Sequence, residues 1–422
     1  MAAPVGARFL IFDGVCMRVR MRWMAALVLV LVPVSGTAGA VDVPGGSPLG
    51  VERSVRAVPG EYIVTVKPTF SPDDVLGKLG VRPLFTYGTA LRGFASVLTP
   101  LQLRLARTLP AVEAIEENSE ITIDVMSSPG AVNRTTGRAG AAGSGAAAEA
   151  GSWGLDRIDQ RGLPLDGQFT VTGTGRGVTA YIIDTGIETA HAEFEGRATV
   201  GFDAVQDGRN GQDCHFHGTH VAGTVGGRTF GVAREVSLVA VRVLDCTGDG
   251  TAAQTIAGLD WIAGHAQPPA VLNASIGDSA SRAIDTATDA VADRGVLPVV
   301  SAGNDAQDAC DASPARAEKA LAVGAVDRQD HQAGFSNFGP CLSLYAPGVG
   351  IVSARLGGGS RTLSGTSMAS PHVAGAAALL KEQDPRATPQ EITRRLTDAS
   401  TTGAVISPGA GSPNRLLHTG GL

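Results

Sequence analysis

Five apolar runs, separated by helical stretches, constrain the fold of this chain more than any other feature of its sequence. A strand that is apolar on both faces is typical of a parallel sheet that helices cover on both sides. Helical stretches such as 251–266 and 283–295 fall between the runs. The pattern therefore predicts an α/β domain with a doubly wound, mostly parallel sheet. The runs occupy residues 178–184, 236–244, 270–276, 296–302 and 320–326.

The composition narrows the class of protein further. The chain has 422 residues, of which 56 are glycine, 18% are charged and only 5% are aromatic. This length suits two or three domains, and many glycines with few aromatic residues favour tightly turned α/β structure over a helical bundle. The formal net charge is −6, and Lys and Arg form no basic stripe in the sequence. These features argue against a nucleic-acid partner.

The N-terminal segment has the pattern of an export signal. Three arginines over 18–22 precede an apolar run over 24–34, and a small-residue cleavage motif ends at residue 40. We assign 1–40 to an N-terminal extension and secretory signal peptide, with Met17 or Met21 as alternative translation starts, and we expect a secreted, extracellular protein. The apolar run is too short to cross a bilayer comfortably. We therefore expect no stable membrane association, and an uncleaved anchor is the alternative.

The cysteines fit an oxidising compartment. Cys16 would leave with the signal, and an even number then remains, which favours two disulfides in an exported chain. Spacing suggests the local pairs Cys214–Cys246 and Cys310–Cys341, although four cysteines allow three connectivities. Each bridge would add about 3–4 kcal/mol in the chain-entropy model. A zinc site is the other interpretation, but the sequence has no Cys-x-x-Cys pair to support it.

A small domain and a linker precede the large domain. Residues 58–124 alternate strand and helix patterns in the order β-α-β-β-α-β, which predicts a compact, ferredoxin-like α+β unit. This unit has no histidine or cysteine, so we expect no chemistry there. Residues 125–151 are rich in Ala, Gly and Ser, which predicts an exposed linker open to proteolysis. The α/β domain then occupies 152–422.

Three residues stand where the catalytic groups of such a sheet should be. Asp184 ends a strand, His217 opens a helix pattern, and Ser367 opens another. A lone serine at a helix start is more often an N-cap. Ser367, however, has the two residue types it would need as a nucleophile, because a serine requires a nearby base and the base requires an orienting carboxylate. Asn304 follows a strand and could face a developing oxyanion beside the backbone N–H of Ser367.

Four segments carry a resemblance to a known family. The sequences AYIIDTGI, HGTHVAGTVGG, SAGN and GTSMASPHVAGAAALL, in this order, resemble the subtilisin family of serine proteases, and the cysteines and WGLDRIDQR resemble its proteinase K and aqualysin-like branch. Residues 58–124 resemble the inhibitory propeptide of that family. The resemblance implies a secreted endopeptidase made as a self-processing zymogen, with the propeptide as its own intramolecular inhibitor.

The resemblance also implies a role for each matching residue. Ser367 would be the nucleophile, His217 the general base and then acid, Asp184 the group that holds the imidazole, and Asn304 the oxyanion donor. The family motif selects His217, and not His215, from the sequence CHFHGTHV. We expect His220 and His372 to be packed structural residues.

Substrate residues follow from the same resemblance. The segments 245–250 and 272–277 match those that flank an extended peptide in the family, which implies main-chain pairing with little side-chain choice. Asp278 stands where a glycine is usual in the family, so the resemblance does not define which side chains the specificity pocket accepts. The candidate substrate-binding residues are Gly248, Gly250, Ser275, Ile276 and Gly277.

Catalysis in this family requires no cofactor, so we expect none. Calcium could add stability, but Ser343 and Glu318 replace typical residues of one site, and Asp156 and Asp159 are alternative ligands. The metal ligands therefore stay unknown. We expect a monomer that acts on proteins and peptides.

Two other functions compete with this one. A catalytically silent protein-binding scaffold of the same fold would predict a broken Asp-His-Ser set, and the sequence has an intact one. An α/β-hydrolase esterase needs Gly-x-Ser-x-Gly with the histidine last. Here the serine comes last, within Gly-Thr-Ser-Met-Ala, which excludes that class.

Overall fold

A computed structural model describes residues 48–123 and 148–422 of the chain. The predicted signal segment 1–40, with Cys16, and residues 125–147 of the predicted linker lie outside these ranges. Among the described residues, no helix combines the length and the apolar character needed to cross a membrane.

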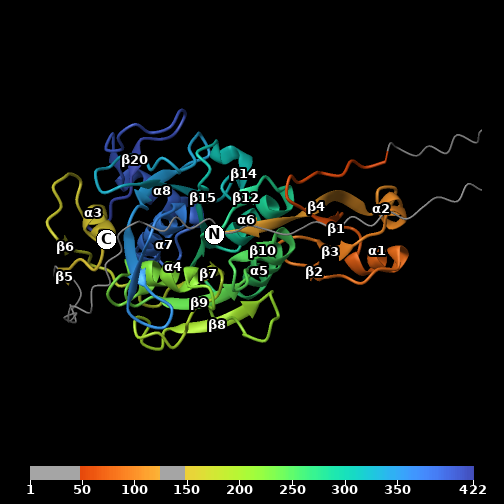
Figure 1. Ribbon diagram of the computed structural model, residues 1–422, viewed down its shortest axis with the longest axis horizontal. Helices are drawn as coiled ribbons and strands as arrows, with labels where there is room; N and C mark the ends of the chain where they lie inside the picture. The colour runs from red at the N-terminus through yellow and green to blue at the C-terminus, as the bar shows by residue number, and fades with distance from the viewer. Residues whose placement is uncertain (1–47, 124–147) are drawn as a thin grey trace, which may run out of the picture. The chain divides into compact units, whose positions relative to one another are not determined.

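The large domain is built on one mixed sheet (Figure 1). Neighbouring strands from β8 to β20 are parallel, and only the edge strand β19 runs antiparallel. This confirms the predicted α/β class, and the five apolar runs are the central strands. In sheet order the strands are β19 (Thr401–Thr402), β20 (Arg415–Leu416), β16 (Leu344–Pro347), β15 (Leu321–Val326), β13 (Val296–Ser301), β11 (Ala270–Ala274), β7 (Thr179–Asp184), β9 (Ser237–Arg242) and β8 (Ala198–Asp203).

Strand β7 is the point where the chain reverses its direction of progress across the sheet. The strands after it lie on one side as β9 and β8, and on the other side as β11, β13, β15 and β16. Ligands of open α/β sheets bind outside the carboxyl ends of the strands at such a switch point. Asp184 is the last residue of β7, so the topology itself places this carboxylate at the expected binding edge.

Helices cover both faces of the sheet. Neighbouring residues of β11 show the division, because Val271 packs into one apolar cluster and Leu272 into the other. This alternation explains why the central strands are apolar throughout. The first cluster includes residues of α3 (Trp153–Asp159), α4 (His217–Gly226), α7 (Thr366–Gln383) and α8 (Pro389–Ala399), and the second includes residues of α5 (Ala252–His265) and α6 (Arg282–Asp293).

The small domain has the predicted order of elements. Its four strands are antiparallel in the order β4-β1-β3-β2, and side chains of Ser71 and Thr99 cap its two helices. Strand β4 also pairs with β10 (Asp249–Thr251) of the large domain, which adds a fifth strand (Figure 1). The elements are β1 (Ala57–Val66), α1 (Pro72–Leu79), β2 (Phe85–Tyr87), β3 (Gly93–Val97), α2 (Pro100–Ala106) and β4 (Val112–Thr122).

Short elements complete the described chain. A hairpin of β17 (Ile351–Ala354) and β18 (Ser360–Leu363) lies against α4. The disulfides join Cys214 to Cys246 and Cys310 to Cys341, which are the two local pairs that the spacing suggested. The remaining pieces are β5 (Ala148–Glu149), β6 (Gln168–Phe169), β12 (Asp278–Ser279), β14 (Ala312–Ser313) and the 3-10 turn Ala309–Asp311.

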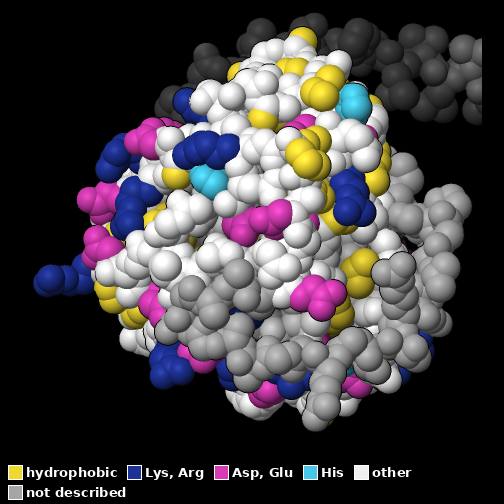
Figure 2. All heavy atoms as spheres, turned by 90° about the vertical axis from the view of Figure 1, so that its left-hand side faces the viewer, with side chains coloured by type: hydrophobic (Ala, Val, Ile, Leu, Met, Phe, Trp, Pro, Cys, Tyr) yellow, Lys and Arg dark blue, Asp and Glu magenta, His cyan; other side chains and the backbone are white. Residues whose placement is uncertain are grey.

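One face of the molecule carries mixed charge. Figure 2 shows one face, on which the coloured acidic and basic side chains are interspersed. On the coloured part of that face no continuous basic stripe is visible, which agrees with the charge pattern of the sequence.

Candidate active site

A pocket opens at the carboxyl ends of β11 and β13. Its walls come from the loops after these strands, from the start of α7 and from the end of the small domain. The predicted residues Ser275, Ile276, Gly277, Asn304 and Ser367 therefore share one cavity. The full lining is Thr122, Ile123, Ser275, Ile276, Gly277, Ser301, Gly303, Asn304, Asp305, Ala312 and Ser367.

The predicted acid and base are in direct contact. Nδ1 of His217 lies 2.8 Å from Oδ1 and 2.9 Å from Oδ2 of Asp184, and both side chains are fully buried. The backbone N–H of Thr185 donates to Oδ1 of the same carboxylate at 2.7 Å. Because the carboxylate accepts from Nδ1–H, this hydrogen bond leaves Nε2 of His217 as the basic nitrogen. Such a tautomer is the one a general base requires.

Asp213, which sequence reasoning missed, holds the approach to His217. Its carboxylate accepts the backbone N–H groups of His215 and Phe216 at 2.9 and 3.0 Å. It also accepts the N–H and the hydroxyl of Thr219 at 3.0 and 2.6 Å. One buried carboxylate thus fixes the backbone on both sides of His217. An aspartate shortly before a helix start is the sequence signal that could have revealed it.

Ser367 is the second residue of α7 and is almost fully buried. Its Oγ donates to the carbonyl of Ser275 at 3.2 Å, and the hydroxyl of Ser275 donates to the carbonyl of Ser367 at 2.9 Å. Asn273 donates to that Ser275 hydroxyl at 2.8 Å and accepts from the hydroxyl of Ser370 at 2.8 Å. This buried network, also missed by sequence reasoning, ties the start of α7 to the end of β11.

The serine and the histidine are not hydrogen-bonded to each other in this structure. Helices α4 and α7 pack together, and His217 is the first residue of α4 and Ser367 the second of α7. Nε2 of His217, however, has no hydrogen-bond partner among the described residues. The structure therefore contains the Asp184–His217 hydrogen bond but not a hydrogen bond between Ser367 and His217. Hydrogen bonds between a nucleophile and its base often form fully only when substrate binds.

Asn304 is anchored by one end of its amide. Its Oδ1 accepts the backbone N–H and the hydroxyl of Thr366, each at 2.9 Å. This orientation makes Nδ2 the end that can donate to a developing negative charge. The same loop is held by Asn337, whose Nδ2 donates to the carbonyl of Ala302 at 2.9 Å.

The other histidines near the site are held uncharged. Burial lowers the pKa of His220 to about 3, with a smaller effect from the charge of His217, and its Nε2 contacts the carbonyls of Ile351 and Arg361. Burial likewise lowers the pKa of His372 to about 4, and its Nδ1 contacts the carbonyl of Met368. Both residues are fully buried, as expected for structural histidines.

Of the two predicted substrate segments, Ser275–Gly277 lines the pocket, whereas Gly248 and Gly250 are not among its lining residues and contact the end of the small domain. The small domain pairs there as an antiparallel strand, with Gly250 opposite Ile121. The N–H of Ile123 donates to the carbonyl of Gly248 at 3.0 Å. The chain therefore binds one of its own extended segments at the residues expected to bind substrate.

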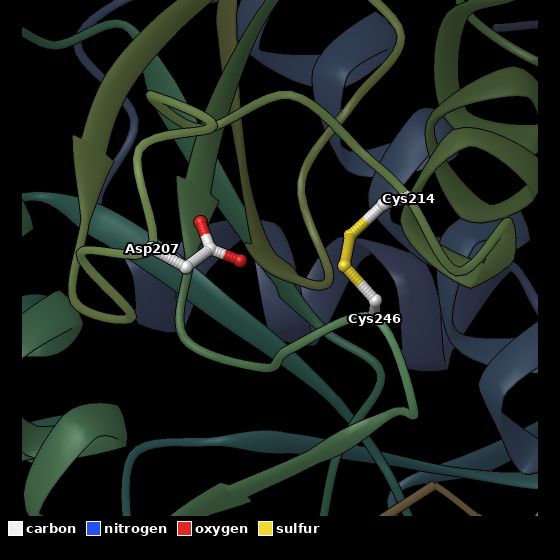
Figure 3. A group of neighbouring side chains, drawn as sticks. All are labelled: Asp207, Cys214 and Cys246. Atoms are coloured by element: carbon white, nitrogen blue, oxygen red, sulfur yellow. A yellow bond between two sulfur atoms is a disulfide. The ribbon is translucent and has the colours of Figure 1, made fainter.

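The structure contains one compact group of metal-type side chains among the described residues, Asp207, Cys214 and Cys246. Figure 3 shows the two cysteines joined to each other, so they offer no thiolate to a metal. The carboxylate of Asp207 instead accepts hydrogen bonds from Nη1 and Nη2 of Arg242 at 2.7 and 2.8 Å. These bonds lower the pKa of the Asp207 carboxyl to about 2. This group is a structural charge cluster.

The alternative calcium ligands are already engaged. The carboxylate of Asp156 accepts the backbone N–H groups of Asp166 and Gly167, and that of Asp159 accepts the N–H of Thr170. Burial raises the pKa of Asp159 to about 6, and repulsion from Asp166 and Asp156 acts in the same direction. Calcium binding at Asp156 and Asp159, or elsewhere, stays a prediction.

An α/β sheet with a buried Asp–His pair at its switch point and a serine at a helix start suits a serine hydrolase. Residues 175–416 match the model of the subtilase family. The chain belongs to the subtilase family and is a subtilisin-like serine protease.

Individual relatives agree with this assignment. An extracellular serine proteinase of Thermus sp. (strain Rt41A) is 42% identical, over 94% of this chain and 98% of that protein. The alkaline serine exoprotease A of Vibrio alginolyticus is 41% identical, over 83% of this chain and 62% of that protein. The crystal structure of a cold-adapted subtilisin-like serine proteinase matches with a TM-score of 0.62 and 46% identity, over 63% of this chain and 97% of that one.

Proposed function

We propose that the protein is a secreted serine endopeptidase that is made as a self-processing zymogen. Ser367 attacks the peptide carbonyl while Nε2 of His217 takes its proton. Asp184 holds the imidazole and stabilises the imidazolium that forms. His217 then returns the proton to the leaving amine, and water hydrolyses the acyl-enzyme through the same base. The observation that carries this proposal is the contact of 2.8 Å between His217 and a fully buried Asp184.

The negative charge of the tetrahedral intermediate needs donors. Nδ2 of Asn304 and the backbone N–H of Ser367 at the start of α7 are the two groups that suit this role, because both residues line the pocket. Donors that are fixed before the reaction stabilise the transition state without reorganisation. The anchoring of Asn304 by Thr366 supplies that rigidity.

The small domain is the inhibitory propeptide in this proposal. Its strand β4 pairs with β10 as an extended substrate would, and Thr122 and Ile123 form part of the wall of the pocket that Ser367 also lines. The first cut would then fall within a few residues after Ile123. The cut is intramolecular, and the cleaved propeptide still fills the same subsites, which explains why activity would wait for its release.

Further contacts hold the small domain on the enzyme. The hydroxyl of Tyr87 donates to the carbonyl of Ala253 at 3.0 Å, and Asn118 accepts the N–H of Ala253 at 2.9 Å. Asp260 accepts the backbone N–H groups of Thr89 and Ala90, each at 2.7 Å. These bonds lie outside the pocket. They support a domain that binds as a separate body after the linking chain is cut.

The location of the protein follows from its N-terminus and its relatives. The segment 1–40 directs export, the two disulfides form outside the cytoplasm, and the protein acts extracellularly on protein substrates as a monomer.

The deciding experiment compares intact mass and N-terminal sequence of exported wild type, Ser367→Ala and the exposed control Ser237→Ala. We expect wild type and Ser237→Ala to lose about the first 125 residues, because the predicted exposed linker, which is open to cleavage, begins there. We expect Ser367→Ala to keep its propeptide. A reactive-serine reagent should label the mature wild type at Ser367 alone. If all three proteins stay whole and unlabelled, the silent protein-binding scaffold is the better description.

A further inference from the structure

A second cavity lies at the end of the sheet opposite the active site. It opens beside the amino-terminal ends of β11 and β13, between the end of α6 and the loop that joins α7 to α8. The volume of this cavity is about 450 Å³, which suits a small organic molecule. The active-site pocket lies at the carboxyl ends of the same parallel strands, so the length of the strands separates the two sites.

Lys381, on α7, places a positive charge in the wall of the second cavity. The residue is only 1% exposed, and its Nζ donates to the carbonyls of Gly295 and Ala387 at 3.1 and 2.7 Å. Both carbonyl residues also line the cavity. Because an ammonium has three N–H donors, one donor of Lys381 remains after these two bonds.

No anion among the described residues pairs with Lys381. Burial lowers the pKa of its ammonium, whereas Asp384 and Glu391 act in the opposite direction without outweighing burial. Both acids have other partners. Asp384 accepts the backbone N–H of Arg386 at 3.3 Å, and Glu391 accepts the N–H of Thr388 at 2.6 Å. Carbonyl oxygens satisfy the donors of a buried ammonium, but an anion is needed to compensate its charge.

The other groups around the cavity suit an anion with an apolar body. Arg386 is exposed and adds a second positive charge. The one acid in the lining, Asp293, already accepts a hydrogen bond from Nζ of Lys319 at 2.6 Å. Most of the remaining wall is apolar and comes from Pro268, Ala292, Pro385, Ala387 and Pro389.

We propose that the second cavity is a binding site for a small organic carboxylate with an apolar body, whose carboxylate accepts the third N–H of Lys381. A peptide that ends in an apolar residue and a fatty acid both have this chemistry. Hydrolysis of a peptide bond leaves a free carboxylate on one of its products, so the proposed endopeptidase reaction would itself supply such ligands. The inference goes beyond the proposed function, because binding requires only the folded large domain.

The test measures dissociation constants by ligand-observed NMR on the exported full-length chain. The chain carries Ser367→Ala, so that the probes meet the same protein whether or not the wild type processes itself. The probes are N-acetyl-leucine, its uncharged amide and octanoate. We expect the preferred acid to bind with a dissociation constant of about 1 mM, as its size suggests. N-acetyl-leucine should bind about tenfold more tightly than its amide, because the amide cannot compensate the buried charge.

Variants of the cavity assign the binding to Lys381. Lys381→Met keeps the length of the side chain without its charge, and it should weaken binding of the preferred acid about tenfold. Arg386→Met should weaken it about threefold, because exposed charges contribute less. Arg415→Met, an exposed arginine on β20 outside the lining, should leave the affinity unchanged.

The relative affinities for N-acetyl-leucine and octanoate distinguish a peptide terminus from a fatty acid. No binding of either acid at about 10 mM, roughly ten times the expected dissociation constant, would overturn the inference. Unchanged affinity in Lys381→Met would overturn it too, and Lys381 would then only join α7 to its neighbours. If Lys381→Met does not fold, the preference for acid over amide and the loss in Arg386→Met decide. The processing experiment tests Ser367 separately, so either proposal can fail alone.

Discussion

The large and small domains meet at one pocket, yet they contribute different things to it. The large domain supplies buried ionisable groups in fixed contact, as between Asp184 and His217. The small domain supplies a strand and polar contacts, and it has no histidine or cysteine. Changes in the large domain should therefore alter chemistry, whereas changes at the small domain's interface should alter release. The predictions below test this division, from the largest effect to the smallest.

Asp184→Asn should cause the largest loss of catalytic activity. An amide in place of the carboxylate would favour the wrong tautomer of His217, and we expect kcat on a peptide substrate to fall about 10⁴-fold. The measurement is steady-state hydrolysis at pH 8, on protein matured by added wild-type enzyme. Near-normal turnover would show that the buried pair is structural.

Asn304→Leu should reduce kcat by about 10²–10³, the loss typical of one missing oxyanion donor. KM should change little, because the donor acts mainly in the transition state. Asn414→Leu serves as a control for loss of a structural amide, since Asn414 bonds Val405 away from the pocket. Equal effects in the two variants would contradict an oxyanion role.

Glu116→Gln should remove a pH dependence of propeptide release. Glu116, on β4, is buried against the large domain and accepts the hydroxyl of Ser281 at 2.9 Å. Burial raises its pKa from 4.5 to about 7, with added repulsion from Glu52 and Asp285. The protonated form fits the complex, so this contribution is complete below pH 4.5 and is lost as the pH rises towards 7.

We therefore expect the dissociation constant of the cleaved propeptide to rise about 10²-fold between pH 5 and 8 in wild type, and to stay nearly constant in Glu116→Gln. The measurement is gel filtration of processed enzyme whose serine has been blocked by a reactive-serine reagent. Glu120→Gln, exposed on the same strand, should keep the wild-type profile. A steep profile in Glu116→Gln would assign the dependence to another group.

Asp260→Ala should weaken the same complex about tenfold at every pH, because it removes charge-assisted bonds to the backbone of Thr89 and Ala90. Turnover of the mature enzyme should not change. The exposed acid Asp398, on α8, offers a control in Asp398→Ala. A loss of kcat in Asp260→Ala would break the division between the two domains.

Sequence patterns predicted the centre of the fold better than its edges. The five apolar runs became β7, β9, β11, β13 and β15 because burial on both faces leaves a continuous apolar signal. Strand β8 is partly exposed, and β16 has only four residues and ends in Pro347. Neither gives such a signal, so both escaped prediction.

For the site, the places of Asp184, His217 and Ser367 at a strand end and at helix starts predicted one crevice, and the structure shows the Asp184–His217 contact and places Ser367 in the pocket. The support around them was not predictable in the same way. Asp213, Asn273 and Ser370 act through bonds between segments that are distant in the sequence, or through turn geometry, and such contacts leave no periodic pattern. The pairing of β4 with β10 is likewise a contact between domains.

The disulfide between Cys214 and Cys246 has a consequence for where the enzyme can work. One cysteine lies three residues before His217, the proposed base, and the other lies two residues before Gly248, a proposed substrate-binding residue, so one covalent bond joins the two segments. A reducing cytoplasm leaves these thiols unpaired. In the proposed function, completion of the active site is therefore coupled to passage out of the cell, which would keep the cell's own proteins away from a finished protease.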